Sequence, residues 1–374
     1  MELIDIIPAV RIVLSADGLV CCQGFINTSE SEFDSLEGVR SIDKTITKAD
    51  CIEIKDFNTI EDIALQLKEQ LQNRPKVKVV LVSDYGAILV DEQVNSSKNS
   101  SVVNGRIIIV TGGAQGFGGG VAEELFTKGA HIVVADLNEE VGNAMVSRLN
   151  SLGLNNKALF VKVNVGDSGS VCQMIEQTVV QLGGVDAIIS NAGILRAGGL
   201  DEMDADTFEL MTKVNYSGYF YCAKHASRVM KQQAEVAPHH FTDIIQINSK
   251  SGLKGSNRNF AYAGGKFGGI GLTQSFALEL MPHNIKVNSI CPGNFFDGPL
   301  WSDPENGLFV QYLKAGKVPG AQTIEDVQAH YEKQVPAGRG CRVKDVAKAI
   351  LYVIDQEYET GQAIPVTGGQ EMLR

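Results

Sequence analysis

The sequence predicts an α/β protein whose larger part is a doubly wound parallel sheet, preceded by a small α+β module. From about residue 103 onward, continuous apolar runs alternate with helical patterns. Strands that are apolar throughout, rather than at every second position, are typical of a parallel sheet with helices on both faces. The polar stretch NSSKNSS at residues 95–101 separates this region from a more varied front segment and indicates a linker.

The front segment, residues 1–94, is expected to form the small module, and its role is unknown from the sequence. Two apolar runs joined by Asp17-Gly18 within residues 11–24 predict a β-hairpin. Residues 60–72 have the apolar spacing of an amphipathic helix, and residues 77–90 resemble a second pair of strands. We expect a linker at 95–102 and the main domain at 103–374.

The main domain repeats strand and helix in order along the chain. A helix is expected at residues 121–129, after the first strand. The expected strands lie at residues 106–112, 131–137, 158–165, 185–193, 243–249, 285–293 and 362–369. This order predicts parallel strands linked by crossover helices.

Composition and charge narrow the class of protein. The chain has 374 residues, 44% of them hydrophobic and 21% charged, with a formal net charge of -11. A chain this acidic is a poor partner for nucleic acid, and it has no apolar run of membrane-spanning length. The first residues lack the features of a signal peptide. Seven cysteines without CxxC pairs or matching histidines predict free thiols and no metal site, so we expect a cytoplasmic protein.

A glycine-rich segment, TGGAQGFGGG at residues 111–120, lies between the first strand and its helix. Glycines at 112, 116 and 118 let the backbone approach a pyrophosphate at the N-terminus of that helix. Asp136 follows Gly118 by 18 residues, at the end of the next strand, where a carboxylate can bind ribose hydroxyls and repel a 2′-phosphate. This arrangement favours NAD over NADP. The alternative is that Asp136 caps the following helix.

The spacing of these glycines resembles the TGxxxGxG pattern of the short-chain dehydrogenase/reductase family. Other motifs of that family follow in order: SNAG at 190–193, VNYSG at 214–218, a Tyr-x-x-x-Lys pair, and Pro-Gly at 292–293. Ser190 and Asn164 stand where the family commonly has asparagine and aspartate. The resemblance covers about residues 103–372 and implies a Rossmann-like fold and a nicotinamide-dependent oxidoreductase.

A tyrosine and a lysine four residues apart, Tyr262 and Lys266, share one face of a helix. An unperturbed phenol has a pKa near ~10, and a nearby ammonium is expected to lower it. By the resemblance, Ser249 binds the substrate oxygen, Lys266 holds the nicotinamide ribose, and Asn215 anchors a water for proton relay. The alternatives are that Tyr262 and Lys266 form a pair on the protein surface and that Ser249 and Ser251 are simply the polar end of a strand.

The resemblance also implies a set of cofactor contacts spread over the strand ends of the main domain. These residues are Gly112, Gln115, Gly116, Phe117, Gly118, Asp136, Asn164, Val165, Asn191, Ala192, Gly193, Tyr262, Lys266, Pro292, Gly293 and Phe295.

The substrate is indicated less directly. The segment at residues 294–320 is long, contains several aromatic residues, and is expected to close over the ligand. Basic residues near the reaction centre favour an anionic substrate, although each can equally be a solvated loop residue. The motifs INSKSG and VPAGRGC (335–341) resemble those of sorbitol-6-phosphate 2-dehydrogenases, which interconvert sorbitol 6-phosphate and fructose 6-phosphate with NAD. The substrate contacts that this suggests are Lys250, Ser251, Asn294 and Arg258.

Two other functions stay open at this point. The substrate can be another polyol or sugar derivative, or the chain can be a sugar-phosphate-responsive regulator with residual dehydrogenase activity. The front module can be a remnant of an aldolase-type partner or an oligomerisation module. By the resemblance, a homodimer or homotetramer is expected to form through the helices that carry Asn215 and Tyr262.

Overall fold

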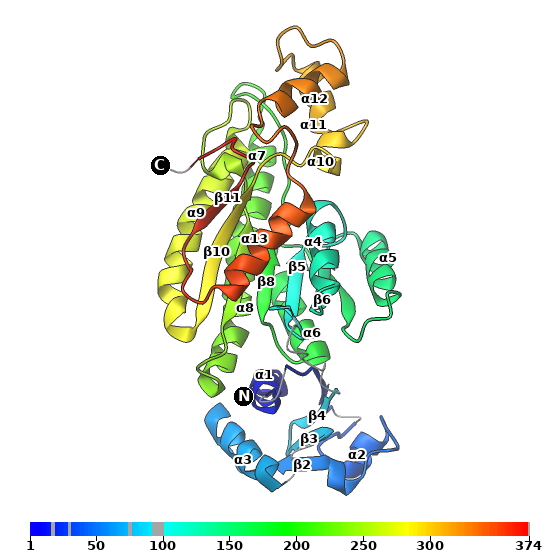
Figure 1. Ribbon diagram of the computed structural model, residues 1–374. Coiled ribbons are helices and arrows are strands. Elements are labelled where there is room, and N and C mark those ends of the chain that lie inside the picture. The colour runs from blue at the N-terminus through cyan, green and yellow to red at the C-terminus, as the bar shows by residue number, and fades with distance from the viewer. Residues whose placement is uncertain (16–18, 29–30, 74–76, 92–100, 373–374) are drawn as a thin grey trace.

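The computed structural model describes residues 1–15, 19–28, 31–73, 77–91 and 101–372. Figure 1 shows three parts: a front module that holds the N-terminus, a large central domain, and a small group of helices at the opposite end. The linker expected at residues 95–102 lies outside the described residues, apart from its last two.

The central domain is built on a sheet that has seven strands among the described residues, in the order β11-β10-β9-β8-β5-β6-β7. Every neighbouring pair is parallel. The strands are β5 (Ile107–Thr111), β6 (His131–Asp136), β7 (Ala158–Lys162), β8 (Ala187–Ser190), β9 (Thr242–Ile247), β10 (Ile285–Pro292) and β11 (Ala363–Val366). The predicted doubly wound fold and its strands are confirmed. The order reverses between β5 and β8, where ligands bind in folds of this kind.

Helices cover both faces of this sheet (Figure 1). Alternate strand residues point into two separate cores, one under α4, α5 and α13 and the other under α6, α8 and α9. The helices are α4 (Gly116–Phe126), α5 (Glu139–Asn150), α6 (Ser168–Leu182), α7 (Ala205–Thr212), α8 (Gly218–Val236), α9 (Phe260–Leu280) and α13 (Val343–Asp355). Short helical turns are η2 (Lys213–Ser217), η3 (Lys250–Gly252) and η4 (Met281–His283). No helix of the described residues is long and apolar enough to cross a membrane.

In the part of the front module that the structure describes, four strands form a sheet in the order β1-β4-β3-β2. Within it β2 and β3 pair in parallel, the other neighbours are antiparallel, and β3 and β4 form the predicted second pair of strands. The elements are α1 (Leu3–Leu14), β1 (Cys22–Ile26), α2 (Leu36–Arg40), η1 (Lys48–Asp50), β2 (Cys51–Ile54), α3 (Ile60–Asn73), β3 (Val79–Val82) and β4 (Gly86–Val90). The α+β character of the module and its helix at residues 60–72 are therefore confirmed.

The predicted hairpin within residues 11–24 is wrong. Its first apolar run belongs to the helix α1, and Asp17-Gly18 lies outside the described residues. Nine of the twelve residues of α1 are buried, so the helix has no polar stripe to reveal its period. Pro8 lies inside the helix, where it removes a backbone donor, and the burial around it outweighs that cost.

The helix α1 joins the module to the central domain. It packs against α8 and α6, and its side chains belong to the same apolar cluster as those helices. Arg11 is fully buried. It donates hydrogen bonds of 3.0 and 2.7 Å to the two carboxylate oxygens of Asp186 and one of 2.7 Å to the Val20 carbonyl. The front module and the main sheet thus meet at a buried ion pair.

At the other end, residues 294–333 form a helical cap over the carboxyl ends of the strands (Figure 1). The cap contains α10 (Pro299–Ser302), α11 (Leu308–Lys314) and α12 (Ile324–Lys333). A cluster of aromatic rings gives it a core of its own, made by Phe296, Trp301, Phe309, Tyr312 and Tyr331. The segment expected to cover the ligand is therefore a compact helical unit.

Candidate functional site

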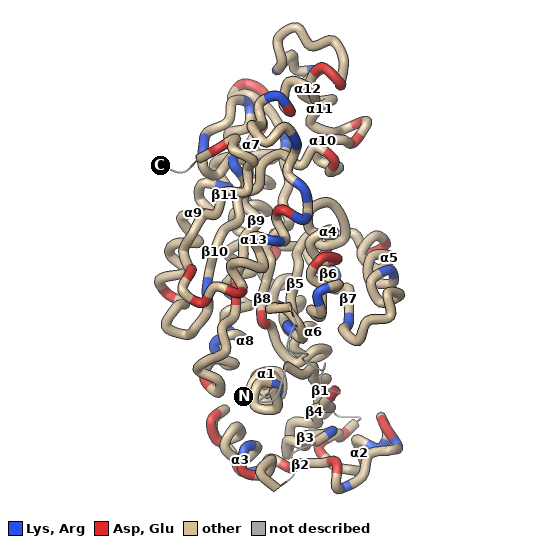
Figure 2. The backbone as a smooth tube through the Cα atoms, viewed as in Figure 1, with Lys and Arg blue, Asp and Glu red and all other residues tan. Residues whose placement is uncertain are grey.

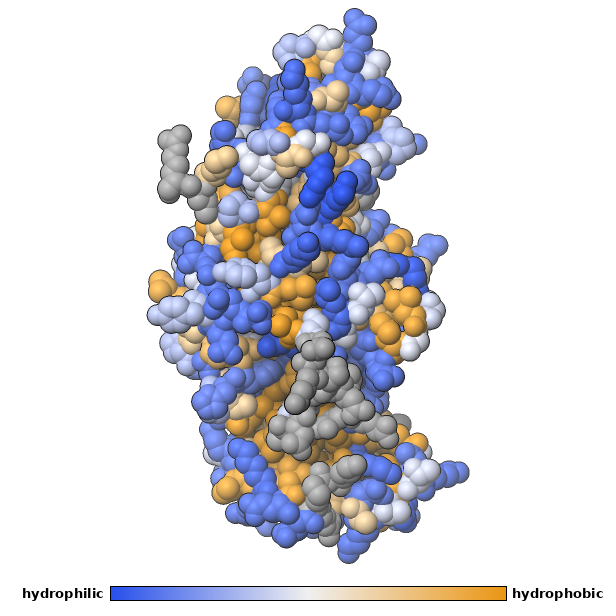
Figure 3. Space-filling view, viewed as in Figure 1, coloured by the Kyte–Doolittle hydropathy of each residue, from blue (hydrophilic) through white to orange (hydrophobic). Residues whose placement is uncertain are grey.

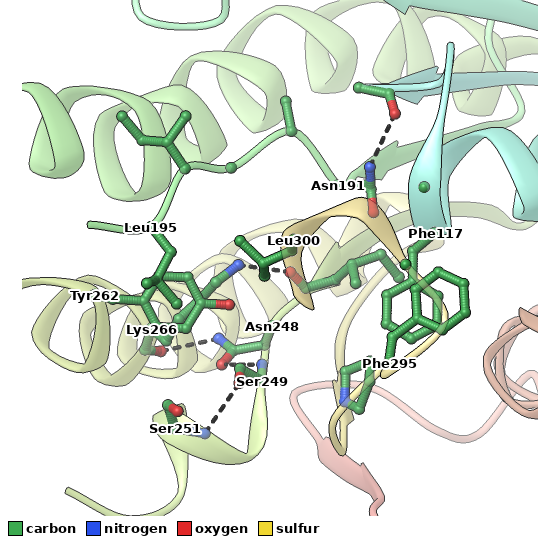
Figure 4. A pocket seen from close by; sticks show the side chains of 18 of the residues that line it. Phe117, Asn191, Leu195, Asn248, Ser249, Ser251, Tyr262, Lys266, Phe295 and Leu300 are labelled. Carbon is green, nitrogen blue, oxygen red and sulfur yellow. Dashed lines mark hydrogen bonds between the residues drawn. The ribbon is translucent and has the colours of Figure 1, made fainter. Parts of the chain in front are cut away.

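A cavity of about 520 Å³ opens at the carboxyl ends of the central strands, under the helical cap. Loops after β5, β6, β8, β9 and β10 line one side of it, and Trp301, Leu308 and Tyr312 line the cap side. Figure 4 shows two groups of side chains within it: Ser249 and Ser251 at η3 with Tyr262 and Lys266 on α9, and Phe117, Asn191 and Phe295 beyond them. The glycine-rich loop and the Tyr262 group therefore line one and the same cavity.

The glycine-rich loop fits a closely approaching ligand. Gly112 and Gly116 have φ of +62° and +60°, a region that L side chains rarely adopt. A Cβ atom at Gly118 would lie 2.0 Å from the Gly112 carbonyl oxygen, so the loop cannot hold a side chain there. The N-cap residue of α4, Gln115, makes no side-chain capping bond. The N–H groups of the first turn are thus available to an anion such as a pyrophosphate.

Asp136 ends β6 and lines the cavity. One carboxylate oxygen accepts a hydrogen bond of 3.1 Å from the Ala114 N–H, and the other accepts one of 3.0 Å from the Asn138 N–H. The helix α5 is capped by Asn138, whose side chain accepts from the Val141 N–H. Since Asn138 caps that helix, the capping alternative for Asp136 fails. The oriented carboxylate can accept further hydrogen bonds from ribose hydroxyls.

The Tyr262, Lys266 and Ser249 side chains come together as the sequence predicted (Figure 4). Lys266 is buried, its Nζ donates a hydrogen bond of 2.8 Å to the Ile247 carbonyl, and it lies 5.5 Å from the centroid of the Tyr262 ring. Ser249 Oγ accepts a hydrogen bond of 3.1 Å from the Ser251 N–H. The strand β9 thus delivers the serine, and one face of α9 delivers the tyrosine and the lysine.

Burial controls the protonation of this group. It raises the pKa of Tyr262 to about 12, although a hydrogen bond with Ser249 acts in the opposite direction. It also lowers the pKa of Lys266 to about 8, and the neighbouring Cys291 opposes that change. The expected lowering of the Tyr262 pKa by Lys266 is therefore not found: loss of water raises this pKa, and the lowering contribution comes from Ser249. The phenol stands ready as a proton donor.

Asn215 lies behind the cavity rather than in its wall. It is buried within η2, a π-helical turn, and its amide bonds the backbone of Ile194 twice: Oδ1 accepts from the N–H and Nδ2 donates to the carbonyl, each at 2.8 Å. A Cβ atom at Gly193 would lie 3.1 Å from Asn215 Oδ1 and 4.0 Å from Lys266 Nζ. Asn215 therefore fixes the loop after β8 next to the lysine.

Most of the residues predicted for the site line the cavity. All the predicted cofactor residues do so except Gly118, which lies beneath Asn191. Lys250, Ser251 and Asn294 also line it, but Arg258 does not. Arg258 lines an adjoining hollow of about 450 Å³ and makes an ion pair with Glu202.

Phe117 and Phe295 stack face to face in the cavity, with ring centroids 4.3 Å apart (Figure 4). Phe117 lies within the glycine-rich segment, in the first turn of α4, and Phe295 follows the Pro-Gly motif at the end of β10. The pair closes part of the wall between the Asp136 end and the Tyr262 end. Their stacking with each other was not foreseen from either motif.

Sequence reasoning missed other lining residues. Asn248 precedes Ser249; its Nδ2 donates to the Lys266 carbonyl at 2.9 Å and its Oδ1 accepts from the Ser249 N–H at 2.8 Å. An asparagine that ends an apolar strand next to the serine was a usable signal. Tyr312, Lys317 and Tyr331 come from the cap and follow no motif, so no sequence signal marked them.

Comparisons with known proteins agree with this geometry. The family described as short chain dehydrogenase matches residues 106–301. Sorbitol-6-phosphate 2-dehydrogenase of Escherichia coli (strain K12) is 33% identical over 271 residues, which cover 72% of this chain and 99% of that protein. The crystal structure of a sorbitol-6-phosphate 2-dehydrogenase from Erwinia amylovora is similar with a TM-score of 0.65 and 35% identity, covering 71% of this chain and 100% of that one. A trans-4-hydroxycyclohexanecarboxylate dehydrogenase from Sinomonas cyclohexanicum is 29% identical over 73% of this chain and 96% of that protein.

Proposed function

Because the chain belongs to the short-chain dehydrogenase/reductase family, we propose that it is an NAD-dependent oxidoreductase that interconverts a sugar-alcohol phosphate and its ketose phosphate. The pair we propose is sorbitol 6-phosphate and fructose 6-phosphate. The observation that carries the proposal is one cavity that holds Ser249, Tyr262 and Lys266 together with the glycine-rich loop and Asp136. The relatives named sorbitol-6-phosphate 2-dehydrogenase support the choice of substrate.

The proton steps follow from the residues around Tyr262. In the reductive direction its phenol, kept protonated by burial, donates a proton to the substrate oxygen, and in the oxidative direction it takes that proton back. Ser249 donates a hydrogen bond to the same oxygen and stabilises negative charge that develops there. Lys266 holds a positive charge below a pKa of about 8, which favours the phenolate when the tyrosine has given up its proton.

A nicotinamide dinucleotide, when bound, supplies the hydride donor or acceptor. The turn at Gly112–Gly118 and the first turn of α4 would hold its pyrophosphate, and Asp136 would bind the hydroxyls of its adenosine ribose. Asn164 and Val165 line the cavity on the same side and would contact the adenine. The carboxylate of Asp136 is the reason to propose NAD rather than NADP, since it would repel a 2′-phosphate.

The substrate would lie between the Tyr262 group and the helical cap. Lys250, Ser251 and Asn294 line that region, and Asn294 has a buried Nδ2 donor without a partner among the described residues. A buried donor without a partner is costly, so a hydroxylated ligand that accepts from Asn294 would satisfy it. Arg258 would contribute charge from the adjoining hollow rather than direct contact.

The test is a substrate panel read by NADH absorbance. Sorbitol 6-phosphate, sorbitol, mannitol 1-phosphate and mannitol are each offered with NAD and with NADP. The proposal expects sorbitol 6-phosphate with NAD to give the highest kcat/KM. Equal rates with free sorbitol would exclude a phosphorylated substrate, and a higher rate with another polyol would replace sorbitol 6-phosphate by that compound.

We extend the proposal to a cytoplasmic enzyme that assembles as a homodimer or homotetramer. Apolar side chains on the outer faces of α7, α8 and α9 are exposed, among them Phe208, Phe220, Phe267 and Leu278. Figure 3 shows further apolar residues among hydrophilic ones on the face that carries α13 and β11, and all four residues of that edge strand are half-buried. Exposed apolar surface of this kind is typical of subunit contacts, and the molar mass in solution tests the assembly.

A further inference from the structure

We propose that Lys317, from the helical cap, binds the phosphate group of the substrate. This inference rests on the proposed function and adds a specificity-determining residue that no sequence motif marks. It is carried by the position of Lys317, by the lack of a carboxylate partner for it among the described residues, and by the charges around it.

The position of Lys317 is fixed by the way α11 ends. Gly316 has φ of +58°, and the Lys317 N–H donates a hydrogen bond of 3.0 Å to the Tyr312 carbonyl while the Gly316 N–H donates one of 3.1 Å to the Leu313 carbonyl. This pair of bonds is a Schellman motif, which stops a helix and sets the direction of the next residue. The following residue, Val318, is buried in the core of the cap, so the backbone on both sides of Lys317 is held.

The side chain of Lys317 faces the ligand space. It lines both the main cavity and the adjoining hollow, and its Nζ lies 3.9 Å from the centroid of the Tyr312 ring. No carboxylate of the described residues forms an ion pair with it, whereas Arg258 pairs with Glu202 and Lys254 with Glu371. Lys317 is therefore a cation at the cavity whose charge is not neutralised by a neighbour.

The surroundings make an anion favourable there. Burial, together with the positive charges of Lys250 and Arg258, lowers the pKa of Lys317 to about 8. Burial also lowers the pKa of Lys250, which Glu371 partly offsets. Figure 2 shows Lys and Arg positions close together between α7 and the cap helices. A phosphate dianion would relieve the repulsion among these cations and would keep Lys317 charged.

The experiment uses Trp301, the one tryptophan of the chain. Trp301 lines the same cavity, and its ring meets the Tyr312 ring at a centroid distance of 5.8 Å. Its emission is titrated with fructose 6-phosphate and with fructose in the full-length protein, and isothermal titration calorimetry gives the same dissociation constants without an optical probe. The variants are Lys317→Gln, Lys317→Arg and the control Lys254→Gln, an exposed lysine outside the cavity lining. NAD binding to each variant checks that the fold is intact.

We expect Lys317→Gln to weaken fructose 6-phosphate binding by about 10- to 100-fold, the effect of losing one charge-assisted hydrogen bond, and to leave fructose binding unchanged. Lys317→Arg should keep most of the affinity, and Lys254→Gln should match the wild type. If the wild type prefers fructose 6-phosphate and Lys317→Gln keeps that preference, Lys317 is not the phosphate ligand. If the wild type itself binds both sugars equally, the phosphorylated substrate of the proposed function is wrong as well.

Discussion

Replacing Arg11 by methionine removes one partner of the buried ion pair between the front module and the main sheet. Both side chains of the Arg11–Asp186 pair have no exposed surface. Burial alone would raise the pKa of Asp186, but the charges of Arg11 and His240 hold it well below its usual range. In the variant the carboxylate keeps the Ile107 N–H at 2.7 Å and His240 at 2.9 Å, yet it loses its permanent positive partner.

Breaking one side of a buried ion pair costs about 3–5 kcal/mol, because the remaining charge stays buried. We therefore expect Arg11→Met to lower the free energy of unfolding by that amount. The matched control is Arg228→Met. Arg228, on α8, also ties α1 to the central domain, through Asp5 at 2.5 Å, but its side chain is 62% exposed. A surface pair of this kind contributes less than about 1 kcal/mol.

The assay is urea unfolding followed by far-UV circular dichroism and by Trp301 emission. The two transitions must coincide before a single free energy is assigned. The double variant Arg11→Met/Asp186→Asn should recover part of the loss, since the unpaired charge is gone. A loss for Arg11→Met no larger than for Arg228→Met would refute the reasoning.

Three further predictions concern cofactor, acid stability and substrate. Asp136→Ala should weaken NAD binding and reduce the discrimination against NADP, measured as the two dissociation constants by calorimetry. Burial lowers the pKa of His131 to about 4, so the folded state resists its protonation. The free energy of unfolding should therefore decrease as pH falls from about 6.5 toward 4, by about 3 kcal/mol in full. His131→Asn should make this decrease smaller in urea unfolding, and an unchanged pH dependence of the unfolding free energy would contradict the prediction. Lys250→Ala should raise KM for sorbitol 6-phosphate more than for sorbitol in steady-state assays, and equal changes would exclude a phosphate contact.

Much of the central domain was predictable because its strands are buried on both faces. Within the expected strands, residues 107–110 and 132–135 are apolar at every position, and polar residues flank them on both sides. The motif residues were also predictable, since Tyr262 and Lys266 depend only on helical spacing and the glycine-rich turn only on local conformation. Signals of this kind depend only on residues close together in the sequence, so they can be recognised without knowing the tertiary structure.

The front module shows where such signals fail. The helix α1 is buried on nearly all sides, so its apolar sequence resembles that of a buried strand. Its helical conformation depends on packing against α6 and α8, which the sequence pattern does not reveal. Its contacts also bear on the alternative of a regulator with a separable module. Because α1 shares the apolar cluster of the central domain, the division at residues 1–94 stays a prediction, and removing the module would expose part of that cluster.

The substrate-binding residues could not be predicted in the same way, because their positions depend on tertiary contacts that motif spacing does not reveal. Arg258 was predicted to bind substrate, but Glu202, 56 residues earlier, pairs with it in the adjoining hollow. Lys317 reaches the cavity only because the cap folds back over the strand ends. The charge of a loop residue is visible in the sequence, whereas its partner is not.

The central claim is that Tyr262 moves the proton in an oxidoreductase site, and Tyr262→Phe tests it most directly. The measurement is kcat for sorbitol 6-phosphate oxidation together with the dissociation constant for NAD. We expect kcat to fall by several orders of magnitude while NAD binding is unchanged, because only the phenolic hydroxyl is lost. Retained turnover in a variant that binds NAD normally would contradict it.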